Sequence, residues 1–102
     1  MKLLWSERAQ QDVLEIGRFI ARDNPSAATD WVAKAVAQAE HVRDFPLVGR
    51  RVPEVPNSAL RELIFGNHRL VYLVQESEVT VVTLFERHRR FPDEIVNSSD
   101  DP

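Results

Sequence analysis

Cysteine is absent from this chain of 102 residues, and its absence excludes disulfide bonds, thiolate catalysis and cysteine-based zinc sites. The three histidines are widely scattered, so we expect neither a metal site nor a cofactor. The sequence also lacks a signal-peptide pattern and any apolar run near the length that a bilayer requires. We therefore expect a soluble cytoplasmic protein that does not associate with membranes. Its length suits one domain with a modest core.

Lysine is scarce, since every basic residue after Lys34 is an arginine. Arginine offers a planar fork for carboxylates or phosphates, but it scarcely deprotonates. The last two-thirds of the chain therefore has no lysine that could act as a general base. Residues 1–92 carry 13 basic and 12 acidic side chains, whereas the charges of residues 93–102 are all acidic. We expect one nearly neutral domain over residues 1–92 and an acidic, disordered tail over residues 93–102.

The first half of the chain predicts a short strand followed by two helices. Residues 2–5 are the strand candidate, and Ser6 is a typical N-cap for a helix whose apolar positions recur at helical spacing. Phe19 widens the apolar stripe of this helix. Either Asn24 or Ser26 can begin the second helix. Two amphipathic helices joined by so short a break indicate an αα-hairpin.

The second half of the chain predicts a loop and then three antiparallel strands. Residues 47–58 contain Gly49, Pro53, Pro56 and Asn57, which are typical of turns, and they should form the loop that crosses from the helices to the sheet. Residues 61–74 and 79–86 supply the strands. Residues 66–67 form the first turn, because glycine supplies the positive φ that a two-residue turn needs, and residues 76–77 form the second.

The register of these strands sorts their side chains into two faces. Two-residue turns would place Arg69 opposite Ile64 and Leu84. One face should pack on the helices: Leu63, Leu70, Tyr72, Val74, Val79, Val81 and Phe85. The other face mixes aliphatic and charged side chains: Glu62, Ile64, Arg69, Val71, Leu73, Val82, Leu84, Glu86 and His88. No further helix remains to cover this second face, so we expect a partner protein to cover it.

The last strand ends in an arginine-rich run, and we expect partner contacts to concentrate beside it. Arginines at one edge of a sheet can form forked ion pairs with the carboxylates of another protein. The candidate partner-binding residues are Arg61, Arg69, Val71, Leu84, Arg87, His88, Arg89 and Arg90. The predicted fold is α+β, with an N-terminal strand, an αα-hairpin and a three-strand antiparallel meander that has the helices on one face.

Over about residues 3–91 the chain resembles the RelE/ParE superfamily of bacterial toxins, the toxic halves of type II toxin–antitoxin pairs. The pieces that carry the resemblance are residues 6–9, 16–20, 24–28, 46–50, 52–54, 61–63, 68–72 and 87–90. The resemblance implies a helical hairpin packed on a small, mainly antiparallel sheet. It also implies a cognate antitoxin whose C-terminal segment wraps the toxin in a hetero-oligomer. We expect this segment either to cover the aliphatic face of the sheet or to lie across the helical hairpin.

The resemblance leaves two targets open. ParE-like members bind DNA gyrase without cutting anything, whereas RelE-like and YoeB-like members cut messenger RNA on the ribosome. Cutting RNA needs a base, a cation that stabilises the phosphorane and an acid, and Glu62, Arg69 and His88 would fill these roles. RelE-type enzymes place lysines on the strand that here reads Leu60-Arg61-Glu62, where this chain has none. We therefore favour a ParE-like gyrase inhibitor without catalytic residues and keep the endoribonuclease as the alternative.

Overall fold

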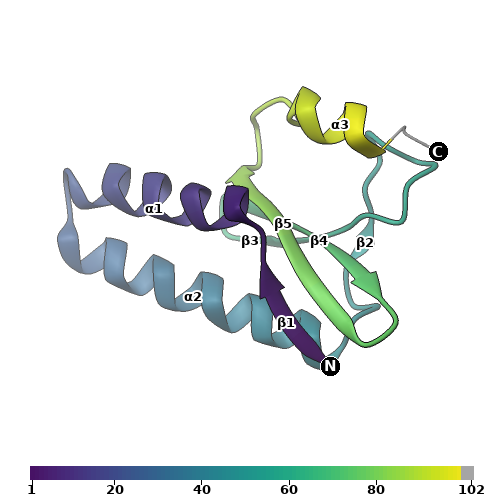
Figure 1. Cartoon of the computed structure of the whole chain (residues 1–102). Coiled ribbons are helices and arrows are strands. Elements are labelled where there is room, and N and C mark those ends of the chain that lie inside the picture. The colour runs from purple at the N-terminus through teal and green to yellow at the C-terminus, as the bar shows by residue number, and fades with distance from the viewer. Residues whose placement is uncertain (100–102) are drawn as a thin grey trace.

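A computed structural model describes residues 1–99 of the chain, which fold into one mixed sheet and three helices (Figure 1). The elements in chain order are β1 (Lys2–Trp5), α1 (Glu7–Ala21), α2 (Pro25–Asp44), β2 (Arg50–Arg51), β3 (Arg61–Phe65), β4 (His68–Gln75), β5 (Glu78–Glu86) and α3 (Asp93–Ser99). Figure 1 shows α1 and α2 side by side, with α3 reached by a connection from the end of β5. No helix within residues 1–99 is long and apolar enough to cross a bilayer.

Polar side chains fix the starts of the two long helices. The Ser6 hydroxyl accepts a hydrogen bond from the amide of Ala9 at 3.0 Å, and this bond satisfies one of the free N–H groups at the start of α1. The Asn24 side chain accepts from the amide of Ala27 at 3.0 Å in the same way. The predicted αα-hairpin is confirmed, and Asn24 rather than Ser26 caps its second helix.

The sheet has the strand order β1-β5-β4-β3-β2. Strands β3, β4 and β5 form the predicted antiparallel meander, and Gly66 adopts φ +56° in the first turn. β1 adds a parallel neighbour to β5, and β2 adds a short antiparallel partner to β3. The predicted α+β class is confirmed. The sequence prediction missed β2, because a two-residue strand leaves no alternation to detect.

A β-bulge changes the predicted faces of the sheet. The register of β4 against β5 shifts between Val71 and Tyr72 and leaves Val82 as an extra residue of β5. Beyond this point Arg69 lies opposite Phe85 rather than the predicted Leu84. A shift of one residue moves a side chain to the other face of the sheet.

The positions beyond the bulge were therefore assigned to the wrong faces. Leu84 packs toward the helices and Phe85 away from them, the reverse of the prediction. The prediction for Ile64 opposite Arg69 is confirmed. The error arises because the predicted register assumed an uninterrupted ladder between two tight turns.

Hydrophobic side chains are buried on both faces of the sheet. The cluster beneath the helices, here called the helix-side cluster, contains Ala9, Ala35, Ala39, Val42, Leu70, Tyr72, Val79, Val81 and Leu84. The cluster on the opposite face, here called the far-face cluster, contains Val52, Val55, Leu60, Val71, Phe85, Phe91 and Ile95. The connection between β2 and β3 and the C-terminal segment supply its outer members. The expectation that this face waits for a partner is therefore wrong for most of its area, because the chain covers it.

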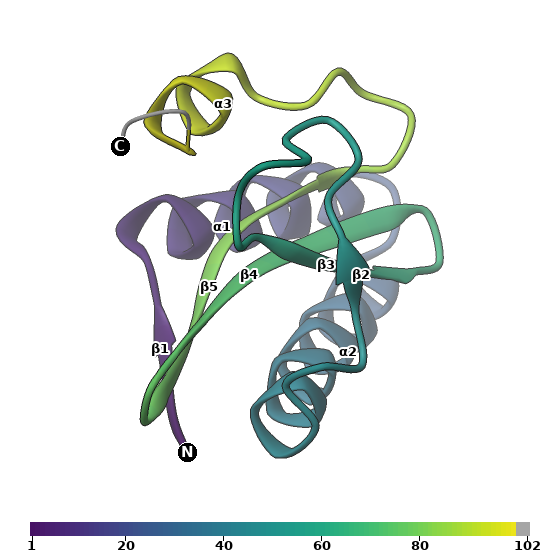
Figure 2. The same ribbon diagram turned by 90° about the vertical axis from the view of Figure 1, so that its right-hand side faces the viewer.

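Helix α3 lies where the sequence predicted a disordered tail over residues 93–102. Figure 2 shows α3 on the same side of the sheet as the connection between β2 and β3. Ile95 is 7% exposed and belongs to the far-face cluster. The amides of Ile95 and Val96 bond to the carbonyl of Pro92 at 3.1 and 3.2 Å. The predicted disorder is wrong for residues 93–99, since burial of this isoleucine anchors the helix, and residues 100–102 lie outside the described residues.

Candidate functional site

Arg69 is the centre of a buried ion-pair network on the far face of the sheet. It lies on β4, and its side chain reaches Glu62 on the neighbouring β3 and Glu54 in the connection between β2 and β3. Its Nη1 and Nη2 atoms donate to the two carboxylate oxygens of Glu54 at 2.8 and 2.9 Å. Its Nε and Nη2 atoms both donate to Glu62 Oε1, the former at 2.8 Å. Arg69 is only 6% exposed and Glu62 only 1% exposed.

Two aromatic rings enclose the same guanidinium. The Arg69 Cζ atom lies 5.0 Å from the ring centroid of Phe85 and 5.4 Å from that of Phe91. The two rings meet edge to face, with centroids 5.6 Å apart. Such positions stabilise a cation through the ring quadrupole, and more strongly where water is excluded. Arg69 therefore joins β4 to the C-terminal segment as well as to the carboxylates.

The network sets the charge states of its members. The hydrogen bonds from Arg69 lower the pKa of the Glu54 carboxyl, although partial burial opposes this shift. The same bonds to Glu54 raise the pKa of the Arg69 guanidinium. Glu62 has no free oxygen in the network, because Arg50 Nε donates to its Oε2 at 2.7 Å while Arg69 occupies Oε1. Glu54 and Arg69 are therefore held in their charged forms by each other.

The three residues considered for RNA cleavage are only partly brought together. Arg69 and Glu62 are hydrogen-bonded to each other. This contact is possible because Arg69 lies opposite Ile64, two residues from Glu62 on the neighbouring strand. His88 lies in the exposed turn after β5, and its amide donates to the Glu86 carboxylate at 3.1 Å. No hydrogen bond among the described residues connects His88 to either of the other two.

The candidate partner-binding residues fall into buried and exposed groups. Val71 and Leu84 are 0% and 1% exposed, so the prediction that they lie on an open face is wrong. Arg61 is half-buried, and its Nη1 donates to the carbonyl of Gly49 at 2.7 Å. Exposed side chains occur at the end of β5, in Arg87, His88, Arg89 and Arg90. These four residues are called the basic segment below.

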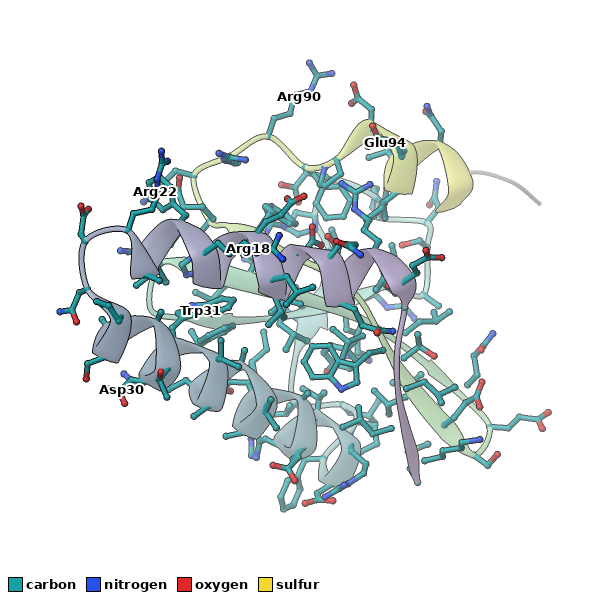
Figure 3. The ribbon with its side chains drawn as sticks, turned by 60° about the vertical axis from the view of Figure 1, so that its left-hand side comes forward. Arg18, Arg22, Asp30, Trp31, Arg90 and Glu94 are labelled. Carbon is teal, nitrogen blue, oxygen red and sulfur yellow. The ribbon has the colours of Figure 1, made fainter. Side chains whose placement is uncertain are left out.

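An open groove lies between α1 and the chain that follows β5. Its volume is about 850 Å³, and its lining includes Ile16 and Phe19 from α1, Arg89 and Arg90 from the basic segment, and Phe91. Figure 3 shows the segment with Arg90 and Glu94 running above α1, on which Arg18 is labelled. An apolar floor with a charged rim is typical of a site for a peptide or a helix.

Sequence reasoning did not identify the α1 side of this groove. Phe19 is 69% exposed, which is unusual for a large apolar residue. The sequence could have indicated it, because Phe19 makes the apolar stripe of α1 wider than packing on one face requires. The groove itself also depends on the path of residues 89–94, which have no periodic pattern of apolar residues.

Metal binding finds no support in the side chains. Among residues 1–99 no group of three or more histidine, aspartate or glutamate side chains is placed to hold a metal ion. The buried carboxylate of Glu62 is fully occupied by arginines. The arrangement can therefore bind charged and apolar groups of another molecule, chiefly at the groove and the basic segment.

Known proteins resemble this chain in sequence and in fold. The model of the family described as "ParE toxin of type II toxin-antitoxin system, parDE" matches residues 3–91. A protein of Sinorhizobium fredii (strain NBRC 101917 / NGR234), named "Putative toxin Y4kP", is 26% identical over 96 residues, which cover 89% of this chain and 93% of the relative. A chain of the solved structure "Chromosomal ParDE TA system from P. aeruginosa" has the same fold, with a TM-score of 0.70, 21% identity, and coverage of 84% of this chain and 95% of that one. The protein belongs to the ParE family of toxins from type II toxin–antitoxin systems.

Proposed function

We propose that the chain inhibits DNA gyrase by binding to it, without cutting nucleic acid, and that a cognate antitoxin neutralises it in a hetero-oligomer. The observation that carries the first part is the state of Glu62. This carboxylate is 1% exposed, and each of its oxygens accepts a hydrogen bond from an arginine. A group in that position cannot accept a proton from a substrate hydroxyl unless the fold opens.

The other groups required for RNA cleavage are equally engaged. The Arg69 guanidinium is enclosed by two carboxylates and two phenyl rings, so it has no free edge to offer a phosphorane. His88 is exposed but is not joined to Arg69 by any hydrogen bond of the described residues. Together with the absence of lysine after Lys34, these contacts support binding rather than cleavage.

The groove beside α1 is the proposed site of the antitoxin segment. Its floor offers Ile16, Phe19 and Phe91 to apolar side chains, while Glu15 and Arg89 on its lining can pair with charges of either sign. An amphipathic helix or extended segment uses such a groove through a few apolar anchors.

The target is tested with purified protein in two parallel assays. We expect the chain to block DNA supercoiling by gyrase and to leave messenger RNA intact in a translating extract. Cleaved transcripts, lost in an Arg69→Lys variant that keeps the charge and remains folded, would support the endoribonuclease instead. Supercoiling that continues at concentrations sufficient for growth arrest would contradict the gyrase proposal.

The antitoxin site is tested with Phe19→Asp, which places a charge on the floor of the groove. We expect antitoxin affinity to fall at least about tenfold, as for an anchor residue of an interface. Leu14→Asp is the matched control, since Leu14 lies on the same helix, is 48% exposed and does not line the groove. Equal affinities of the two variants would place the antitoxin elsewhere.

A further inference from the structure

Three large apolar side chains are exposed in the connection between α2 and β2. Phe45, Leu47 and Val48 are 60%, 71% and 45% exposed. They are called the 45–48 loop here, together with Pro46. Monomeric soluble proteins seldom cluster apolar side chains on the surface without a binding role. None of the three lines the groove beside α1.

The backbone of this loop is held firmly although its side chains are free. The buried hydroxyl of Tyr72 accepts a hydrogen bond from the amide of Gly49 at 2.9 Å and donates one to the carbonyl of Pro46 at 2.8 Å. Arg61 Nη1 donates to the carbonyl of Gly49 at 2.7 Å. The amide of Val48 bonds to the carbonyl of Phe45 at 3.0 Å, which closes a turn. Four hydrogen bonds thus fix both ends of a short loop.

An ordered backbone that carries exposed apolar side chains favours binding to a partner. A loop that is already ordered loses little conformational entropy when a partner closes over it. The bonds from Tyr72 and Arg61 go to backbone atoms, so they fix the shape of the loop without engaging its apolar side chains. Stability of the chain alone would have been served by turning Leu47 inward or replacing it with a polar residue.

The charge around the loop specifies the kind of partner. Arg50 and Arg51 follow the loop after Gly49 and are exposed, and the Arg50 side chain keeps 62% exposure despite its bond to Glu62. Arg51 Nη1 donates to a backbone carbonyl, that of Ser58, at 2.9 Å. Asp44, which directly precedes the loop, is paired with Arg43 at 3.0 Å. Arg50 and Arg51 therefore leave residues 43–51 with a net positive charge beside the exposed apolar side chains. Two copies meeting through this patch would bring their arginines together, which disfavours self-association.

The loop and the groove lie apart on the molecule. Figure 2 shows the connection from α2 to β2 at the opposite end of the molecule from α3 and the segment that precedes it. We propose that the 45–48 loop, with Arg50 and Arg51, is the surface that engages the toxin's protein target, through an acidic face of that target with an apolar pocket for Leu47. This inference rests on the proposed function, since it divides target binding and antitoxin binding between two surfaces.

The test uses Leu47→Glu and Arg51→Glu in the full chain, with Leu14→Glu as a control that adds the same charge at another exposed leucine. Growth arrest on induction, affinity for gyrase and affinity for the antitoxin are measured for each, with thermal unfolding as a check on folding. We expect the two loop variants to lose at least about tenfold in gyrase affinity. Growth arrest should be relieved, while antitoxin affinity stays within about twofold, as for distant sites.

Several outcomes would overturn the inference. They are unchanged growth arrest in both loop variants, equal loss in Leu14→Glu, or a parallel loss of antitoxin binding. A wild-type dimer that Leu47→Glu dissociates would show instead that a second copy occupies the loop. If wild-type chain arrests growth without affecting gyrase, the proposed target is wrong, and the loop is judged by growth arrest alone. If wild-type chain causes no arrest, the proposed function and the inference both fail.

Discussion

Arg69 connects segments that lie far apart in the chain. Its guanidinium contacts Glu54 before β3, Glu62 on β3 and Phe91 after β5. A charge buried in this way is tolerated because its hydrogen-bonding groups meet oppositely charged partners. Removing one member of this network should therefore lower the free energy of unfolding more than replacing all of its members with apolar residues. The residue stabilises the cover of the far face and does not act as an open binding group.

Arg69→Ala should lower the free energy of unfolding by about 3–5 kcal/mol, because Glu62 would remain as a buried charge without its main partner. Urea unfolding followed by circular dichroism measures the change. Arg89→Ala is the control, since Arg89 is exposed and should change stability by less than about 0.5 kcal/mol.

A second substitution separates charge from packing at the same site. Glu62→Gln in the Arg69→Ala background removes the buried negative charge, which keeps only Arg50 as a partner, so part of the lost stability should return. A double-mutant cycle then gives the coupling between the two side chains. Additive losses would show that Arg69 acts through its ring contacts and its bond to Glu54 alone.

Gly49 is required by close packing and not by its dihedral angles. A Cβ atom there would lie 2.5 Å from the carbonyl oxygen of Glu62 and 2.6 Å from the Tyr72 hydroxyl. Gly49→Ala should therefore destabilise the chain by about 3 kcal/mol, as overpacking does. Gly17→Ala is the matched control in α1, where the Cβ would meet Val32 at an ordinary 3.5 Å. That change should stabilise the helix by about 0.5–1 kcal/mol. Thermal unfolding of both variants compares them.

His68 makes the helical hairpin sensitive to pH. The indole of Trp31 donates to Nδ1 of His68 at 3.2 Å, and Figure 3 shows Trp31 between the two long helices. Burial lowers the pKa of His68 from its ordinary value of 6.5, although Glu86 opposes the shift. A folded pKa below the unfolded one gives stability that is present above pH 6.5 and is lost as the pH falls below it.

We therefore expect the free energy of unfolding to fall more steeply on acidification from about pH 7 to about pH 5 in wild-type chain than in His68→Gln. Trp31 fluorescence should change over the same range, because a protonated imidazole cannot accept the indole hydrogen. Identical pH profiles of the two proteins would show that the hydrogen bond contributes nothing to the titration.

Besides the two-residue strand β2, sequence patterns could not predict α3 and the bulge of β5. Helix α3 has Ile95 and Val96 among acidic and polar residues, too few for a helical period. Its burial depends on an apolar face that exists only because Val82 bulges and turns Phe85 outward from the helices. Both features are consequences of tertiary packing, and a local pattern does not contain them.

The elements that were predicted correctly are those whose own residues contain a local sequence pattern. The hairpin of α1 and α2 has two N-cap side chains and a helical apolar stripe, and the turn of β3 and β4 has Gly66 with its positive φ. The family was also recognisable, because short pieces in a fixed order span most of the chain. The pairing of Arg69 with Glu54 could not be predicted, because Glu54 lies in the connection between β2 and β3 and no sequence pattern indicates the path of that connection.

Phe91 holds the C-terminal segment on the far face, and we expect Phe91→Ala to cost about 3–5 kcal/mol. Its ring is 4% exposed and contacts both Phe85 and the Arg69 guanidinium. Loss of the ring should also loosen α3, which hydrogen exchange of the Ile95 and Val96 amides would detect. Asn97→Ala, on the exposed side of α3, is the control. A small loss of stability would mean that α3 is not coupled to the sheet.

At the scale of the whole molecule, one sheet separates two apolar clusters, and the elements that cover the two clusters differ in length. The helix-side cluster lies under two long helices, whereas the far-face cluster lies under a loop and a helix of seven residues. Short elements with few buried contacts open first. The two faces should therefore differ in local stability within one folded domain.

Native-state hydrogen exchange should show this order. We expect the amides of β4 and β5, in the centre of the sheet, to exchange only with global unfolding, and those of α3 to exchange earlier. Trp5 and Trp31 both pack against the helix-side cluster, so tryptophan fluorescence would not follow the earlier opening. Exchange of all three elements at one rate would show that both clusters unfold as one unit.

The parallel pairing of β1 with β5 joins residues 2–5 to residues 78–81. During synthesis from the N-terminus, β1 has no partner strand until β5 has been made, which is late in translation. A nascent chain that stops before residue 78 leaves its opening strand unpaired. A prematurely terminated product would therefore be unable to complete the sheet.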